Sequence, residues 1–161
     1  MRGIFGAVSI AAGLLAWSGA AAAAPVWDVS PPFKVAVSLT PKAAARLAHP
    51  HETIVVSAYV YGEATPKGVK RHLADEMDQI DFGKEQYIEI PGAGVAQVPG
   101  VRYDKTKLAY IDGGKLLVLV NVYSGRRSAK DNLIECGIFE DSVALAAKAP
   151  IPIACKLIGE P

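Results

Sequence analysis

Apolar and polar residues alternate along much of the chain, and this pattern predicts β-strands. Every second residue is apolar between Phe33 and Leu39, and the same period of two returns between Thr53 and Tyr61. A strand with one buried face has this period, because successive side chains point to opposite faces of the sheet. Further strands are predicted at residues 86–90, 133–139 and 151–158. Two more are predicted at 107–111 and 115–123, which flank a glycine turn; residues 116–120 are apolar on both faces, as in a central strand.

A single short helix is expected at residues 41–48. Thr40 is a suitable N-cap, and Pro41 fits the first helical position, where its missing N–H costs nothing. The helix should end at His49, because the residue before a proline is pushed out of the helical region. The inward-facing residues are expected to be Ala44, Leu47 and Ala48.

The remaining segments are predicted to be turns and loops. Asp112-Gly113-Gly114 predicts a hairpin between the strands at 107–111 and 115–123, since glycine permits the positive φ of tight turns. Residues 63–83 are interpreted as a polar loop with one short ordered piece. Residues 92–100, which contain glycine and proline, are interpreted as a turn region.

These elements predict an all-β fold, a two-sheet antiparallel sandwich with one short helix. This plan resembles that of immunoglobulin-like or transthyretin-like domains. The resemblance is architectural, because no motif in the sequence identifies a family, and it therefore implies no function.

The first 23 residues have the three parts of a cleavable signal peptide. Arg2 supplies the positive charge, residues 4–16 are apolar, and small residues follow, with Ala21 and Ala23 before the expected cleavage. A retained membrane anchor is the alternative, but Pro25 follows this stretch and no cluster of Lys or Arg does. We therefore predict a signal peptide at 1–23, a single domain at 24–161, and a periplasmic or secreted protein.

The balance of charged residues narrows the classes of possible partner. Removal of residues 1–23 takes away one of the 17 basic residues and leaves 16 against 16 acidic ones. Nucleic acid or an anionic membrane surface would require a basic excess, so neither is expected as a partner.

Cys136 and Cys155 are the only cysteines, and in an oxidising compartment they are predicted to form a disulfide.

Two surfaces are candidates for binding a protein, peptide or glycan. Arg126 and Arg127 lie in a polar stretch at the end of a strand, where sandwich folds place recognition loops. The alternative is that these arginines pair with Asp131 or other loop acids and hold a turn. The second surface is a sheet face with tyrosines and an amide, which the short helix or the polar loop could instead cover; its residues are Tyr59, Tyr61, Asn121 and Tyr123.

Metal binding and catalysis have less support in the sequence than binding of a protein, peptide or glycan. His49 and His51 could bind copper or zinc, although they also suit a solvated turn. No Gly-x-Ser-x-Gly motif is present, and carboxylate pairs such as Glu140 and Asp141 fit loop charges. We therefore expect a non-enzymatic binding domain without a required cofactor. The alternatives are a periplasmic copper- or zinc-binding protein and a hydrolase-type enzyme.

Overall fold

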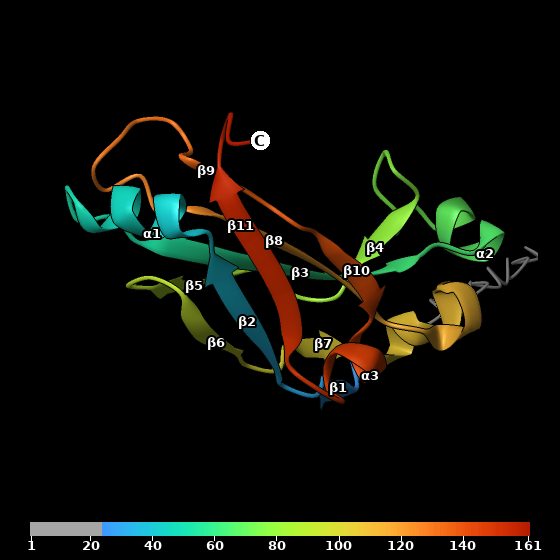
Figure 1. The fold of residues 1–161 in the computed structure, drawn as a ribbon. Coiled ribbons are helices and arrows are strands. Elements are labelled where there is room, and N and C mark those ends of the chain that lie inside the picture. The colour runs from blue at the N-terminus through green and yellow to red at the C-terminus, as the bar shows by residue number, and fades with distance from the viewer. Residues whose placement is uncertain (1–23) are drawn as a thin grey trace, which may run out of the picture.

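The computed structural model describes residues 24–161, and the predicted signal peptide at 1–23 lies outside these residues (Figure 1). The described part is mostly β, with few helices. The strands are β1 (Trp27–Val29), β2 (Phe33–Leu39), β3 (Ile54–Glu63), β4 (Gln79–Asp81), β5 (Gln86–Ile90), β6 (Gly94–Val98), β7 (Arg102–Asp104), β8 (Leu117–Ser124), β9 (Ile134–Cys136), β10 (Phe139–Ser142) and β11 (Ile151–Leu157). The helices are α1 (Pro41–Ala48), α2 (Pro66–Lys70) and α3 (Val143–Ala146), with 3₁₀-helices η1 (Lys105–Tyr110) and η2 (Asp112–Gly114).

Two larger sheets and one short ribbon make up the β structure of residues 24–161. The first sheet, here the β3–β8 sheet, has the order β10-β8-β3-β4, and β5 pairs with the part of β3 that β4 leaves free. The second, the β2–β11 sheet, has the order β6-β2-β11-β9. β1 and β7 form the ribbon. The two larger sheets lie one in front of the other in Figure 1.

The core lies between the two larger sheets, and alternation along the strands fills it. On β3 the inward residues include Ile54 and Val56, and on β2 they include Val35; all three have no exposed surface. These residues belong to one continuous buried cluster that draws on both sheets. The period of two in the sequence therefore reports the buried face of each sheet.

One strand pair differs from the antiparallel arrangement that was predicted. β11 runs parallel to β2 on one side and antiparallel to β9 on the other. Alternation fixes which face of a strand is buried but gives no information about strand direction. The all-β prediction is confirmed, whereas the expectation of purely antiparallel sheets is wrong.

Helix α1 begins and ends where the sequence predicts. The Thr40 hydroxyl oxygen accepts a hydrogen bond from the Ala43 N–H at 3.2 Å, and Pro41 occupies the first turn. The buried residues are Ala43 and Leu47, so the expectation that Ala44 and Ala48 face inward is wrong. Ala43 and Leu47 lie one turn apart, on the row that contacts β2 and β11.

The prediction of a single helix is wrong, because the 63–83 segment also contains α2 and strand β4. Thr65 and Pro66 repeat the capping pair that begins α1, and the Thr65 hydroxyl accepts from the Gly68 N–H at 3.3 Å. A second short helix, α3, is capped by Ser142. None of the helices within residues 24–161 has the length and apolar character needed to cross a bilayer.

The predicted hairpin at 112–114 does not form. The stretch at 107–111 belongs mostly to η1, where the Asp104 side chain caps the Thr106 N–H at 2.9 Å. β8 pairs with β3 and β10 instead. Two further boundaries are wrong: the 92–100 turn region contains β6, and the strand predicted at 133–139 divides into β9 and β10, which belong to different sheets.

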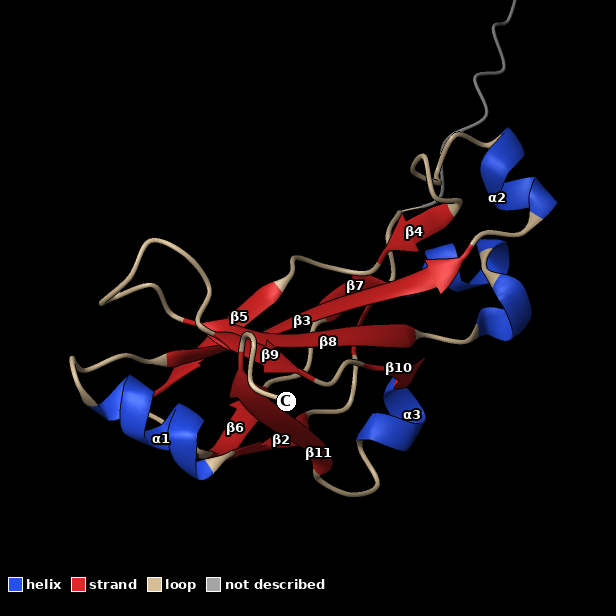
Figure 2. Cartoon of the chain, turned by 45° about the horizontal axis from the view of Figure 1, so that its top comes forward, coloured by secondary structure: helices blue, strands red, loops and turns tan. Residues whose placement is uncertain are grey.

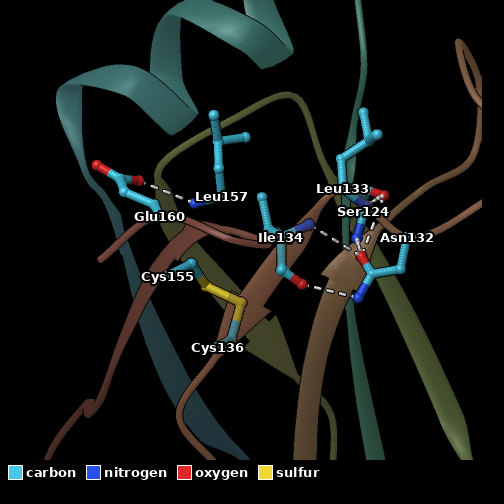
Figure 3. Close-up of a disulfide and its surroundings, with 8 residues drawn as sticks. All are labelled: Ser124, Asn132, Leu133, Ile134, Cys136, Cys155, Leu157 and Glu160. Carbon is cyan, nitrogen blue, oxygen red and sulfur yellow. Dashed lines mark hydrogen bonds between the residues drawn. A yellow bond between two sulfur atoms is a disulfide. The ribbon is translucent and has the colours of Figure 1, made fainter.

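The predicted disulfide between Cys136 and Cys155 is present (Figure 3). The two residues are paired in register across β9 and β11. Near the bond, the Asn132 side chain accepts from the Ser124 N–H at 2.9 Å and donates to the Ile134 carbonyl at 2.7 Å. The bond and this amide together attach the end of the 125–132 loop to both larger sheets.

Candidate functional site

The outward side of the β3–β8 sheet carries the four residues predicted to share a face. Tyr59 and Tyr61 point outward from β3, and Asn121 and Tyr123 point outward from β8, opposite Ser57 and Val55 respectively. We call this surface, with the neighbouring side chains of β4, β5 and β10, the outer face. The structure therefore brings together all four side chains that the sequence assigned to one surface.

Neither α1 nor α2 packs across the outer face. Helix α1 contacts β2 and β11 of the other sheet, and α2 contacts η1. Figure 2 shows these two helices near opposite ends of the β3–β8 sheet. The rest of the 63–83 segment reaches this face at β4, where Asp81 accepts from Tyr59, and neighbouring side chains leave Ser57 and Tyr61 only 2% and 3% exposed.

Tyrosine hydroxyls on the outer face are paired with carboxylates. Tyr59 donates to Asp81 and Tyr61 donates to Glu140. The rings of Tyr59 and Tyr61 stack, with centroids 5.4 Å apart and planes 9° from parallel. Burial, followed by the bond to Glu140, raises the pKa of Tyr61 to about 12. Both phenols therefore stay protonated, and each holds its carboxylate in a fixed position.

A second part of the outer face lies over the middle of β3. Ser57 is almost fully buried there and donates to Glu85. Tyr87, which is 62% exposed, also donates to Glu85, at 2.5 Å. On the other side of Ser57 stand the half-buried Asn121 and Tyr123. Glu85 therefore contacts both Ser57 and Tyr87, and the exposed surface here is formed by Tyr87 together with the half-buried Asn121 and Tyr123.

At the other end of the outer face is a hollow of about 340 Å³. Its polar lining comes from strand ends and from η2, and its apolar lining from β8. The hollow is lined by Tyr61, Glu63, Asp112, Lys115, Leu117, Glu140 and Asp141. Carboxylates dominate this lining, so the hollow favours a positively charged group.

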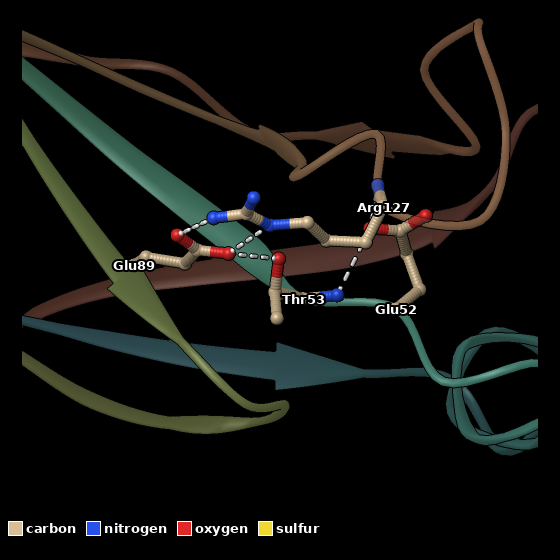
Figure 4. Close-up of polar contacts among 4 residues, drawn as sticks. All are labelled: Glu52, Thr53, Glu89 and Arg127. Carbon is tan, nitrogen blue, oxygen red and sulfur yellow. Dashed lines mark hydrogen bonds and ion pairs between the residues drawn. The ribbon is translucent and has the colours of Figure 1, made fainter.

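Arg127 is held by two carboxylates from different elements (Figure 4). Its guanidinium donates to both oxygens of Glu89 on β5, at 2.8 and 2.5 Å. This contact, followed by a bond from Thr53, lowers the pKa of Glu89 to about 2. The main-chain N–H of Arg127 donates to the second carboxylate, Glu52, at 2.8 Å.

Glu52 is a fully buried carboxylate that organises the 125–132 loop. Its oxygens also accept from the Ser128 N–H and hydroxyl, each at 2.7 Å, and from the Thr53 N–H at 3.0 Å. Burial alone would raise the pKa of Glu52, but these hydrogen bonds outweigh it and lower the value to about 2. Glu52 therefore remains ionised and fixes the loop backbone.

The two arginines predicted as one binding pair have different surroundings. Arg127 is paired as the turn-holding alternative requires, but with Glu89 on a neighbouring strand instead of Asp131. Arg126 is exposed, has a left-handed φ of 57°, and makes no hydrogen bond or ion pair with residues 24–161. Burial, followed by the charge of Glu85, raises the pKa of Tyr123, and the charge of Arg126 opposes this rise. Arg126 is thus a cation beside the outer face that has no partner among residues 24–161.

The candidate metal ligands His49 and His51 are both exposed at the end of α1. In the part of the chain that the structure describes, no three His, Cys, Asp or Glu side chains group as a metal site would require. Copper or zinc binding stays an untested prediction.

The hydrolase alternative is also untested. Ser57 contacts a carboxylate, Glu85, and no histidine side chain between residues 24 and 161 hydrogen-bonds to a serine or an acid.

Sequence reasoning missed several residues of these clusters, among them Glu52, Glu85, Tyr87 and Glu89. Tyr87 and Glu89 could have been placed, because they alternate with apolar residues on the strand that was predicted at 86–90. Glu52 could not, since nothing in its local pattern indicates burial.

Comparison with known proteins adds no assignment. No family model, no curated protein and no solved structure matches the chain.

Proposed function

We propose that the protein is a non-enzymatic binding domain that acts in the periplasm or as a secreted protein, and that its outer face contacts the ligand. The partner class is a protein, peptide or glycan. The observation that supports this most is the sheet face on which Tyr87, opposite Ser57, and Tyr123, opposite Val55, present aromatic side chains that neither α1 nor α2 contacts. Aromatic side chains with polar groups nearby are common in recognition surfaces.

The proposed plan for the two larger sheets is an immunoglobulin-like or transthyretin-like sandwich. Their facing apolar sides contribute to one core, which supports this plan. The parallel pairing of β2 with β11 departs from this sandwich plan.

The disulfide is compatible with export, and we propose cleavage of the signal peptide after Ala23. Amino-terminal sequencing of the exported protein should then begin at Ala24.

The binding proposal can be tested by NMR titration of the disulfide-bonded protein. Three soluble probes cover the partner classes: a lysine-rich peptide, a glutamate-rich peptide and chitohexaose. We expect saturable shifts of backbone amides in β3, β5 and β8 with at least one probe. The variant Tyr87→Ala/Tyr123→Ala should weaken that binding about tenfold, equivalent to about 1.4 kcal/mol.

The control is Trp27→Ala, which removes an exposed aromatic side chain from the β1–β7 ribbon. This variant should bind as the wild type does. The proposal is wrong if no probe shifts the outer face, or if the tyrosine and tryptophan variants lose affinity equally.

A further inference from the structure

The outer face is long enough for an extended chain. It follows β3 from Val55 to Tyr61, and six steps at about 3.3 Å per residue give a length of about 20 Å. Tyr87 and Tyr123 lie near one end, and the hollow beside Tyr61 lies at the other. A peptide of about six residues in extended form matches this length.

The charge along this path is strongly acidic. Six carboxylates lie on the outer face or in the hollow: Glu63, Asp81, Glu85, Asp112, Glu140 and Asp141. The cations there are Lys115 in the hollow, Lys107 beside Asp81 and Arg126 at the far end, and Glu89 neutralises Arg127. Since the domain as a whole has equal numbers of acids and bases, this excess is local to the face. It attracts a positively charged partner.

The carboxylates can still accept hydrogen bonds from a ligand. Each tyrosine hydroxyl occupies one site on one oxygen, and an ionised carboxylate offers about four lone-pair sites. Tyr59 and Tyr61 hold Asp81 and Glu140 in place before any ligand arrives. Fixed acceptors lose little side-chain entropy on binding, which favours affinity.

Tyrosine rings on the same path suit cationic side chains. Tyr87 and Tyr123 present aromatic surface beside Glu85. Lysine and arginine can lay their alkyl stems over such rings while the charged end reaches a carboxylate. A neutral glycan could stack on the rings but would leave the excess of carboxylates over cations on this face without a counterpart.

We propose that the outer face binds an extended, lysine- and arginine-rich polypeptide segment of a partner protein. The segment lies along β3 and places one cationic side chain in the hollow between Tyr61, Asp112 and Glu140. This inference rests on the proposed function, since it names the partner class of the same face.

Fluorescence anisotropy tests this inference with labelled peptides of about ten residues, long enough to span the face. One peptide alternates lysine and serine, and a second alternates glutamate and serine. We expect the lysine peptide to bind saturably and the glutamate peptide not to bind. Binding should weaken at least about tenfold at about 1 M NaCl, where the Debye length is about 3 Å.

The variant Glu63→Gln/Asp112→Asn removes two charges from the hollow without touching a tyrosine hydrogen bond. It should weaken lysine-peptide binding about tenfold. The matched control Glu76→Gln/Glu135→Gln removes two exposed carboxylates elsewhere and should change binding less than about twofold. Unchanged thermal unfolding of both variants shows that they are folded.

Equal binding of the two peptides, or equal losses in the two double variants, would overturn the basic-segment proposal. If chitohexaose alone shifts the outer face, the partner class is wrong and the binding function stands. If no probe shifts this face, both proposals fall together.

Discussion

The main-chain N–H of Arg127 donates to the buried carboxylate of Glu52 over 2.8 Å, whereas the guanidinium of the same residue pairs with Glu89. The 125–132 loop is therefore held through its backbone by an acid that precedes β3. The arginine side chain is a second and more exposed attachment.

Replacement of Glu52 should destabilise the protein. Glu52→Gln removes a charged acceptor from the N–H groups of Arg127 and Ser128, and the free energy of unfolding should fall by about 1–3 kcal/mol. Urea unfolding followed by circular dichroism measures this change. Glu135→Gln, an exposed control, should stay within about 0.5 kcal/mol of wild type. Equal effects of the two substitutions would contradict the role of Glu52.

The arginine side chains should contribute little stability. In Arg126→Ala/Arg127→Ala the main-chain bond to Glu52 remains, and only an exposed ion pair worth about 0–1 kcal/mol is lost. The melting temperature should therefore change far less than in Glu52→Gln. A double variant less stable than Glu52→Gln would show that the guanidinium of Arg127 holds the loop.

Stability should decline in acid. The pKa values of Glu52 and Glu89 are lowered to about 2 from 4.5. A carboxylate whose pKa is lower when folded stabilises fully above its unfolded pKa, and this stabilisation is lost as the pH falls through the folded pKa. The free energy of unfolding should thus be nearly constant from pH 7 to about 5.5 and fall between pH 4.5 and 2. Urea unfolding at a series of pH values measures this change in the free energy of unfolding.

The variant Glu52→Gln tests whether protonation of Glu52 causes this loss of stability in acid. Without the titrating group, stability should depend less steeply on pH below 4.5 than in wild type. Parallel curves for the two proteins would assign the decline to other carboxylates.

Loss of the Cys136–Cys155 bond should reduce stability by about 2–5 kcal/mol, as in other small disulfide-bonded domains. The bond closes a loop over a sequence separation of 19 residues and joins two strands of one sheet. Cys136→Ser/Cys155→Ser should therefore unfold at lower urea concentration than the oxidised protein. Intact-mass measurement should show the oxidised protein two hydrogens lighter than the reduced one. Equal urea midpoints would contradict a stabilising role.

Two glycines should respond differently to alanine. A Cβ at Gly100 would lie 2.0 Å from the carbonyl oxygen of Ser30, whereas a Cβ at Gly92 has no atom within 4 Å. Gly100→Ala should cost about 1–3 kcal/mol through displacement of the backbone. Gly92→Ala should be neutral or slightly stabilising, and thermal unfolding of both variants distinguishes them. Equal melting temperatures would show that the Ser30 backbone yields without cost.

Local patterns predicted the elements whose signals are complete within a few residues. Phe33–Leu39 alternates without interruption, and Thr40-Pro41 contains both parts of a helix start. The strand prediction at 107–111 failed because a short run of apolar residues also fits a 3₁₀-helix, and the Asp104 cap favours the helix. Gly94–Val98 was missed because glycine and proline around it indicate a turn.

The outer face was predictable for the same reason that the core was. Once β3 lies beside β8, alternation places Tyr59 and Tyr123 on one side. The partners of Arg127 were not predictable, because Glu52 and Glu89 are brought to it only by the packing of two strands. Long-range contacts of this kind leave no periodic signal in the sequence.

The position of β11 between β2 and β9 imposes an order on folding. β2 is made early in synthesis, yet one side of it stays without its neighbour until residues 151–157 emerge. The β2–β11 sheet therefore cannot be completed until residues 151–157 have been synthesised. A chain that stops before residue 151 would leave β2 and β9 as open edges, which are templates for aggregation.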